Sequence, residues 1–135
     1  MYQSYSLSHK EAQAMIEVIQ AKLESEKKAA AVAVTDSHGE LIAFLRMDGC
    51  HLPPLYVAIN KAFTAARECR ESGDVGKASR TAGFPMTNYG DLRYTGWSGG
   101  FPIVYKNQVI GAIGVSGLDE EQEAELGRLA LGLIK

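Results

Sequence analysis

Apolar side chains recur at helical spacing near the start of the chain. The stripe consists of Ala12, Met15, Ile16, Ile19 and Leu23. Such a stripe is typical of a helix that packs one face against a core. Ser8 and Glu11, just before it, have the spacing of a capping box. Leu7 and Ala12 are placed to form the accompanying hydrophobic staple. The pattern predicts a helix that begins after Ser8 and ends in the charged run ESEKK.

The next apolar runs predict a first hairpin. Residues 29–35 are apolar without alternation, as in a central strand that is covered on both faces. The sequence DSHG at residues 36–39 supplies turn residues, and LIAFLRM at residues 41–47 forms a second run. Two strands joined by so short a turn pair antiparallel, so the sheet is expected to be antiparallel.

A second hairpin is predicted near the end of the chain. The runs FPIVY and QVIGAIGV flank Lys106 and Asn107, a pair suited to a tight turn. Pro102 lacks a backbone N–H, so its strand should lie at an edge of the sheet, or the proline should stand at the start of the strand.

Two further helices are predicted. Pro53 and Pro54 mark a helix start, where a missing N–H is tolerated. A ladder of small residues at Ala58, Ala62 and Ala65 would let this helix lie close to whatever it covers, with Lys61 and Thr64 on a different face. Asp119 opens the last helix. Its expected core face contains Leu126, Leu129, Ala130 and Leu133.

Residues 71–100 follow neither period. A structureless segment of this length is unusual in a compact domain, so we expect short helices here, with room for one strand, or a binding surface.

Length and composition limit the class of protein. The chain has 135 residues, 46% of them apolar and 22% charged, which is typical of one globular domain spanning residues 1–135. A net charge of −2 without a basic patch gives no sign of nucleic-acid binding. The first residues do not have the pattern of a secretory signal, and no apolar run has the length of a membrane span. Two cysteines do not form a disulfide framework. We therefore expect a cytoplasmic protein.

The stretch RMDGCHLPP at residues 46–54 contains the densest candidate chemistry. Cys50 and His51 are neighbours, and two ligands do not complete a tetrahedral metal site. Haem differs, because one axial imidazole suffices when a pocket binds the macrocycle. His51 is therefore either a haem ligand or an ordinary loop histidine. Arg46 and Asp48 form a small charged cluster with Lys61, either as surface ion pairs or as partners for the carboxylates of a ligand.

Other motifs carry less chemistry. His9 lies in the first turn of the first helix and either reaches the rim of the core or serves as a second candidate ligand. His38 falls in a turn, where exposure is expected. GAIGVSG lies within a strand and is not the dinucleotide-binding pattern, so its glycines are expected to permit close backbone contacts. No dedicated catalytic acid, base or nucleophile is identified.

Three segments taken in order resemble one family. VAVTDSHGELIAFLRMDG, AINKAFTAA and GGFPIVYKNQVIGAIGVSG look like the haem-binding and haem-degrading family of HbpS and GlcG. They are also similar to the C-terminal domain of the PduO corrinoid adenosyltransferase. The resemblance runs from about residue 8 to the last helix. It departs from the family after RMDG, where a small residue is usual and Cys50 and His51 stand instead.

The resemblance implies an α+β, profilin-like fold with a five-stranded antiparallel sheet, N- and C-terminal helices and a helical insertion. It also implies homo-oligomers, tetramers or octamers, that bind a tetrapyrrole. The expected cofactor is haem, which the protein would store, sense or break down reductively. The alternative is a corrinoid-binding or accessory module of small-alcohol or glycolate metabolism without enzymatic activity. The expected cofactor-binding residues are His51, as possible axial ligand to the metal, with Arg46, Asp48, Lys61, Thr64 and His9.

Overall fold

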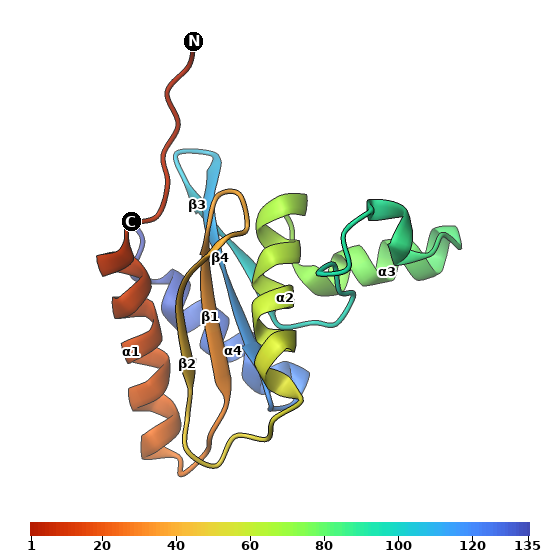
Figure 1. Cartoon of the computed structure of the whole chain (residues 1–135). Helices are drawn as coiled ribbons and strands as arrows, with labels where there is room; N and C mark the ends of the chain where they lie inside the picture. The colour runs from red at the N-terminus through yellow and green to blue at the C-terminus, as the bar shows by residue number, and fades with distance from the viewer.

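A four-stranded antiparallel sheet lies at the centre of the protein in the computed structural model, which describes residues 1–135 (Figure 1). The strand order across the sheet is β2-β1-β4-β3. The strands are β1 (Ala31–Asp36), β2 (Leu41–Arg46), β3 (Gly100–Tyr105) and β4 (Gln108–Ser116). Both predicted hairpins are confirmed. Lys106 and Asn107 have positive φ angles of 47° and 61°, as a tight turn between β3 and β4 requires.

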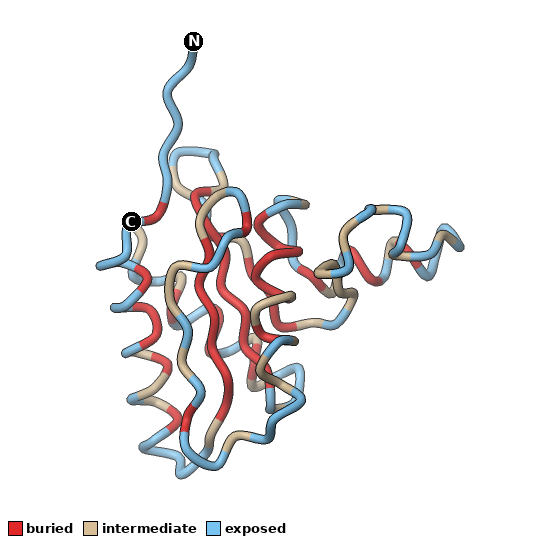
Figure 2. The backbone as a smooth tube through the Cα atoms, viewed as in Figure 1, coloured by how far each residue is buried: buried red, intermediate tan, exposed pale blue.

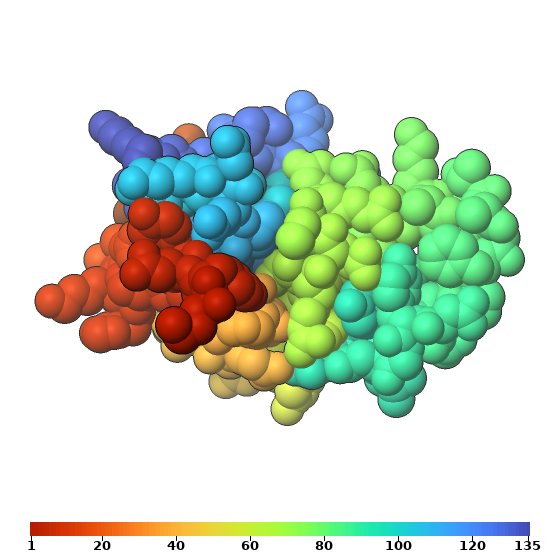
Figure 3. Space-filling model, turned by 90° about the horizontal axis from the view of Figure 1, so that it is seen from above, coloured from red at the N-terminus to blue at the C-terminus, as the bar shows by residue number.

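Helices cover both faces of the sheet. The helices are α1 (His9–Ser25), α2 (Pro54–Glu68), α3 (Ser72–Ala82) and α4 (Glu120–Leu131), with a short 3-10 helix η1 (Met86–Tyr89). α1 and α4 pack on one face and α2 packs on the other, while α3 and η1 extend sideways beyond α2 (Figures 1 and 3). No helix combines the length and the apolar character that a membrane crossing requires.

β1 lies at the centre of the core because both of its faces are covered (Figure 2). Val32 and Val34 belong to the apolar cluster with α1 and α4, whereas Ala31 and Ala33 belong to the cluster with α2. This division explains why the run at residues 29–35 lacks alternation in the sequence. Valine and alanine alternate instead of apolar and polar residues. The smaller alanines let α2 lie closer to the sheet than the valines allow α1 and α4 to lie.

α2 lies so close to the sheet that its backbone contacts the backbone of the strands. Its small residues Ala58, Ala62 and Ala65 are fully buried, as the ladder predicts. A Cβ built on Gly114 of β4 would lie 2.0 Å from the carbonyl oxygen of Ala58. A Cβ built on Gly100 of β3 would lie 2.2 Å from the carbonyl oxygen of Lys61. The glycines of these strands therefore serve close backbone contact, as expected from the sequence.

One ion pair is buried in the protein, and it joins α2 to α4. The Nζ atom of Lys61 lies 3.1 Å from Oε1 of Glu123 and donates to the carbonyl oxygen of Val115 at 3.0 Å. The backbone N–H of Leu118 donates to Oε2 of Glu123 at 3.3 Å. The two side chains are only 5% and 4% exposed. Burial raises the pKa of the Glu123 carboxyl, and the Lys61 ammonium opposes that rise.

The expected five-stranded sheet is wrong, because the sheet has four strands. The segment between α3 and β3 had room for a fifth strand, but it forms η1 and turns. Gly96 in this segment packs against Gly76 of α3, where an added Cβ would lie 2.6 Å from the Cα of Gly76. The segment lies against a helix rather than against a strand edge. The α+β class and the helical insertion agree with the structure.

The termini of the helices follow the sequence more closely than their core faces do. The capping box of Ser8 and Glu11 is present, and Asp119 caps α4. In α4, however, Leu129 is exposed and Glu123 is buried, and Leu133 lies beyond the end of the helix and is also exposed. Lys61 and Thr64, which the sequence places on a different face of α2 from the alanine ladder, are both buried.

Replacing Gly114 with alanine is expected to lower the free energy of unfolding by about 3 kcal/mol, because a methyl group would meet the Ala58 carbonyl oxygen. Gly132→Ala is the matched control. Gly132 has a φ of −62° and its added Cβ would meet nothing nearer than 3.3 Å, so the change should stay below about 1 kcal/mol. Urea unfolding measures both variants, and equal losses would contradict the close approach of α2.

Replacing Lys61 with methionine is expected to lower the free energy of unfolding by about 3–5 kcal/mol near pH 8, because it leaves the Glu123 carboxylate buried without its cation. The loss should shrink towards pH 5. Burial raises the pKa of Glu123 in the folded state and Lys61 opposes that rise, so the variant should hold this pKa higher than the wild type does. The folded variant then binds more protons than its unfolded chain over a wider pH range, so its stability falls more than that of the wild type as pH rises.

Urea unfolding at the two pH values measures this dependence. The double variant Lys61→Met/Glu123→Leu is the control, because it removes both charges. It should recover most of the stability and lose the additional pH dependence. A single variant with the same loss at both pH values would show that the carboxylate is not the source of the cost.

Candidate functional site

The loop of residues 47–53 joins β2 to α2 and holds the reactive residues noted in the sequence. Gly49 has a φ of +87°, a left-handed conformation that suits glycine and turns the chain after Arg46 and Asp48. Pro53 caps α2 and Pro54 is its first residue, as predicted. His51 lies between these two fixed points, and its side chain is exposed.

A groove of about 380 Å³ runs beside this loop. Its lining consists of Lys27, Lys28, Ala29, Asp48, Gly49, Cys50, His51 and Gly117. The two lysines come from the turn between α1 and β1, where Lys27 adopts a positive φ of 56°. An imidazole and two ammonium groups therefore surround one hollow that also contains a single carboxylate. We call this hollow the His51 groove.

Arg46 lies in an adjoining hollow of about 330 Å³. The two hollows share Lys28 and Asp48 in their linings. Arg46, Asp48 and His51 are thus brought to one end of the molecule, as their closeness in the sequence implies.

Cys50 is half-buried beside His51. Burial raises the pKa of its thiol, and the positive charge of Arg46 partly opposes this effect. The Sγ atom lies 3.4 Å from the carbonyl oxygen of His51. A thiol with a raised pKa is a poor nucleophile at neutral pH, so the geometry gives no support to a catalytic cysteine here.

The other predicted site residues are not brought to the His51 groove. Lys61 is engaged with Glu123 and Val115, and Thr64 accepts a hydrogen bond from the backbone N–H of Thr95 at 2.9 Å. His9 is exposed at the start of α1, at the opposite end of the molecule from the loop that holds His51 (Figure 1). One groove therefore cannot include all six residues within this chain.

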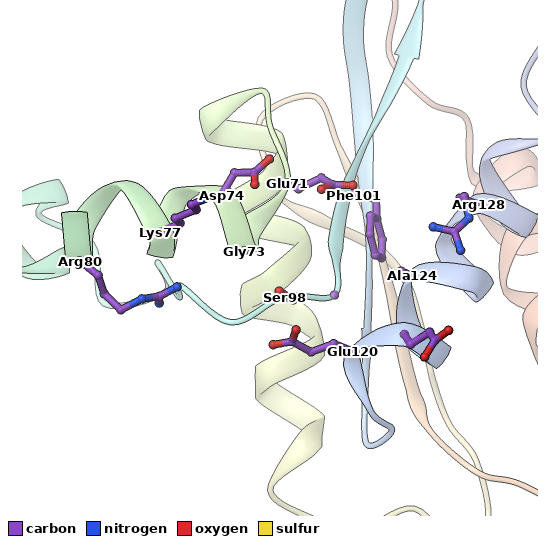
Figure 4. A pocket seen from close by; sticks show the side chains of 12 residues that line it. Glu71, Gly73, Asp74, Lys77, Arg80, Ser98, Phe101, Glu120, Ala124 and Arg128 are labelled. Atoms are coloured by element: carbon purple, nitrogen blue, oxygen red, sulfur yellow. The ribbon is translucent and has the colours of Figure 1, made fainter. Parts of the chain in front are cut away.

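A larger groove, of about 610 Å³, lies between α3 and α4 (Figure 4). We call it the α3–α4 groove. Its charged lining residues are Glu71, Asp74, Lys77, Arg80, Glu120, Glu121 and Arg128. Gly73, Ser98, Gly99, Phe101 and Ala124 complete the lining. The sequence offers a binding surface in residues 71–100 as one alternative, but it does not identify the α4 wall of this groove. Lys77 and Arg80 on one helix, and Ala124 and Arg128 on the other, stand about one turn apart and share a face.

No group of three or more His, Cys, Asp or Glu side chains is arranged to hold a metal ion in the chain. A haem site is a different case, since it needs one protein ligand and a surface for the macrocycle. The exposed imidazole of His51, with cations beside it, is chemically suited to that role.

Comparison with known proteins places the chain in a family. A family model described as haem degrading protein HbpS-like matches residues 7–131. Protein GlcG of Escherichia coli strain K12 is 35% identical over 117 residues, which cover 82% of this chain and 81% of GlcG. A 15.0 kDa protein from the dhaT-dhaS intergenic region of Citrobacter freundii is 30% identical over 126 residues, covering 89% and 86% of the two chains.

Solved structures agree with this assignment. Protein ORFY of Klebsiella pneumoniae superimposes with a TM-score of 0.88 and 27% identity, over 98% of this chain and 92% of ORFY. HbpS shares the fold with a TM-score of 0.88, 24% identity and coverage of 100% and 94%. A PduOC:heme complex shares it with a TM-score of 0.85, 20% identity and 96% coverage of each chain. The resemblance found in the sequence is confirmed, and the chain belongs to the HbpS-like family of haem-degrading proteins.

Proposed function

We propose that this protein binds haem at the His51 groove, with His51 as the axial ligand. The observation that carries the proposal is an exposed imidazole beside a groove lined by two lysines, in a chain whose family is described as haem degrading. One imidazole from the protein is enough to bind haem iron.

The charges of the groove suit the propionate groups of haem. Lys27 takes part in no ion pair within the chain, and Lys28 lies 3.6 Å from Glu26 while still lining the groove. Arg46 lies in the adjoining hollow and provides a third cation. Lys61 donates to partners inside the protein, so the proposal assigns the propionates to Lys27, Lys28 and Arg46.

The groove offers little apolar surface of its own. Leu52 and Tyr56, at and just after the loop, are 66% and 75% exposed, and they are the exposed large apolar side chains nearest to His51 in the sequence. We propose that they cover part of the macrocycle. A second copy of the chain would cover the rest, in keeping with the homo-oligomer expected from the sequence.

Titration of the purified protein with hemin tests the site. A saturable Soret band is expected, and His51→Ala should abolish or shift it, because the axial ligand is lost. Lys27→Gln should weaken binding by about fivefold, in line with the loss of one partly exposed charge contact. His38→Ala is the matched control, since His38 is exposed in the turn between β1 and β2.

Three results would count against this assignment. One is the absence of a saturable band, and another is a band that His51→Ala leaves unchanged. The third is a band that disappears in His9→Ala, which would move the ligand to the other end of α1. Native mass measured with and without hemin tests the oligomer, and a monomer in both conditions would remove the proposed cover by a second copy.

Reductive haem breakdown is the second candidate function, and the family description favours it. The chain offers no acid, base or nucleophile dedicated to such a step, so the chemistry would be that of haem and oxygen. The residues of the protein would bind haem and leave one of its faces open. The corrinoid-binding and accessory alternatives stay predictions from the sequence, with no feature of the groove in their favour.

Incubating the hemin complex with ascorbate in the presence of catalase checks this second function. A Soret band that declines in the wild-type complex, and faster than in a sample of free hemin, is expected. His51→Ala should fall to the rate of free hemin. A Soret band that persists in the wild-type complex would contradict haem breakdown while leaving haem binding intact.

A further inference from the structure

The α3–α4 groove contains charged side chains that do not neutralise one another. Four carboxylates and three cations line its walls. None of these seven side chains takes part in any of the ion pairs of the protein. Opposite charges that face a common hollow without contact leave room for a ligand between them.

The two walls of the groove each carry opposite charges. In Figure 4, Arg80 of α3 lies to the left of Ser98 and Glu120 of α4 lies below it. Glu71, at the start of α3, and Arg128 of α4 lie on either side of Phe101 in the same view. Each wall therefore presents both signs of charge.

Buried hydrogen bonds hold both walls in place. The Oγ atom of Ser72 in α3 accepts from the backbone N–H of Gly100 at 2.8 Å and donates to the carbonyl oxygen of Trp97 at 2.6 Å. The ion pair of Lys61 and Glu123 ties α4 to α2. Fixed walls reduce the ordering cost of binding a small ligand.

The floor of the groove is shaped by glycine. Gly99 has a φ of +120°, and an added Cβ would lie 2.7 Å from Nζ of Lys61 and 2.8 Å from Oε1 of Glu123. Gly73 of α3 touches Ser98 so closely that an added Cβ would lie 2.4 Å from its Oγ atom. Gly99 at the floor of the groove thus contacts the buried ion pair directly, and α3 contacts the neighbouring Ser98 directly through Gly73.

The mixture of charges narrows the class of ligand. A simple anion such as phosphate would meet four carboxylates, and a simple organic cation would meet three cationic side chains. The carboxylates do not converge into a metal site. A small molecule that carries both a cation and an anion suits both sets, because its ammonium would pair with a carboxylate such as Glu120 or Glu121 and its carboxylate with Arg80 or Arg128.

We propose that the α3–α4 groove binds a free amino acid through its ammonium and carboxylate groups. The ring of Phe101 and the methyl group of Ala124 offer an apolar surface for the side chain of the ligand. This site is separate from the His51 groove, and the two share no lining residue.

Isothermal titration of the full chain with each of the common free amino acids, up to about 10 mM, tests the proposal. At least one amino acid should bind with saturation at one site per chain. Its N-acetyl derivative and its amide, which each lack one charge, should bind at least tenfold more weakly. Arg80→Gln and Glu121→Gln should each weaken binding by about tenfold.

The matched controls are Lys10→Gln and Glu125→Gln, which remove charges of the same signs outside the groove, the second on α4 itself. Both should bind the amino acid as the wild type does. Circular dichroism of each variant separates lost binding from lost folding.

The proposal is overturned if no amino acid binds, if the N-acetyl derivative and the amide bind as tightly as the parent, or if Glu125→Gln weakens binding as much as Glu121→Gln. A hemin titration on Arg80→Gln distinguishes the two sites. Haem binding should be unchanged, and competition between haem and the amino acid would show that the α3–α4 groove belongs to the haem site instead.

Discussion

The buried ion pair between Lys61 and Glu123 fixes the arrangement on which the other features depend. It links the helix on one face of the sheet to a helix on the other, around the end of β4, where Lys61 also binds the Val115 carbonyl oxygen. Without it, α4 would be attached to the sheet mainly through apolar contacts, which are not directional. The pair specifies one orientation of α4, and with it the position of the acidic residues in the first turn.

Local signals in the sequence were enough to predict most of the elements. A capping box, a helical stripe and two turns depend on residues that are close in the chain, so α1 and both hairpins agree with the prediction. The missing fifth strand had no such basis. A segment becomes a strand only where it pairs with an edge of the sheet, and residues 83–99 instead form η1 and turns, with Gly96 against Gly76 of α3.

In the candidate site, too, contacts between residues close in the sequence were predictable and contacts between distant residues were not. Arg46, Asp48 and His51 come from one turn and lie near one another, as their spacing implies. The burial of Lys61 was not predictable, because its partner Glu123 stands 62 positions away, at the start of another helix. The pairing of α3 with α4 in the α3–α4 groove was not predictable for the same reason, since each wall alone has the pattern of an ordinary charged helix face.

The division of β1 into large and small side chains has a consequence for how the two faces can vary. On the α1 and α4 face, Val32, Val34 and Ile113 pack among other aliphatic side chains, where swaps of similar volume can be absorbed. On the α2 face, alanine meets glycine and backbone meets backbone, so any larger residue would have to move a whole helix. Substitutions that change function can therefore be accommodated in the loops and on the outer faces of the helices. The contact between α2 and the sheet tolerates almost no change in side-chain size.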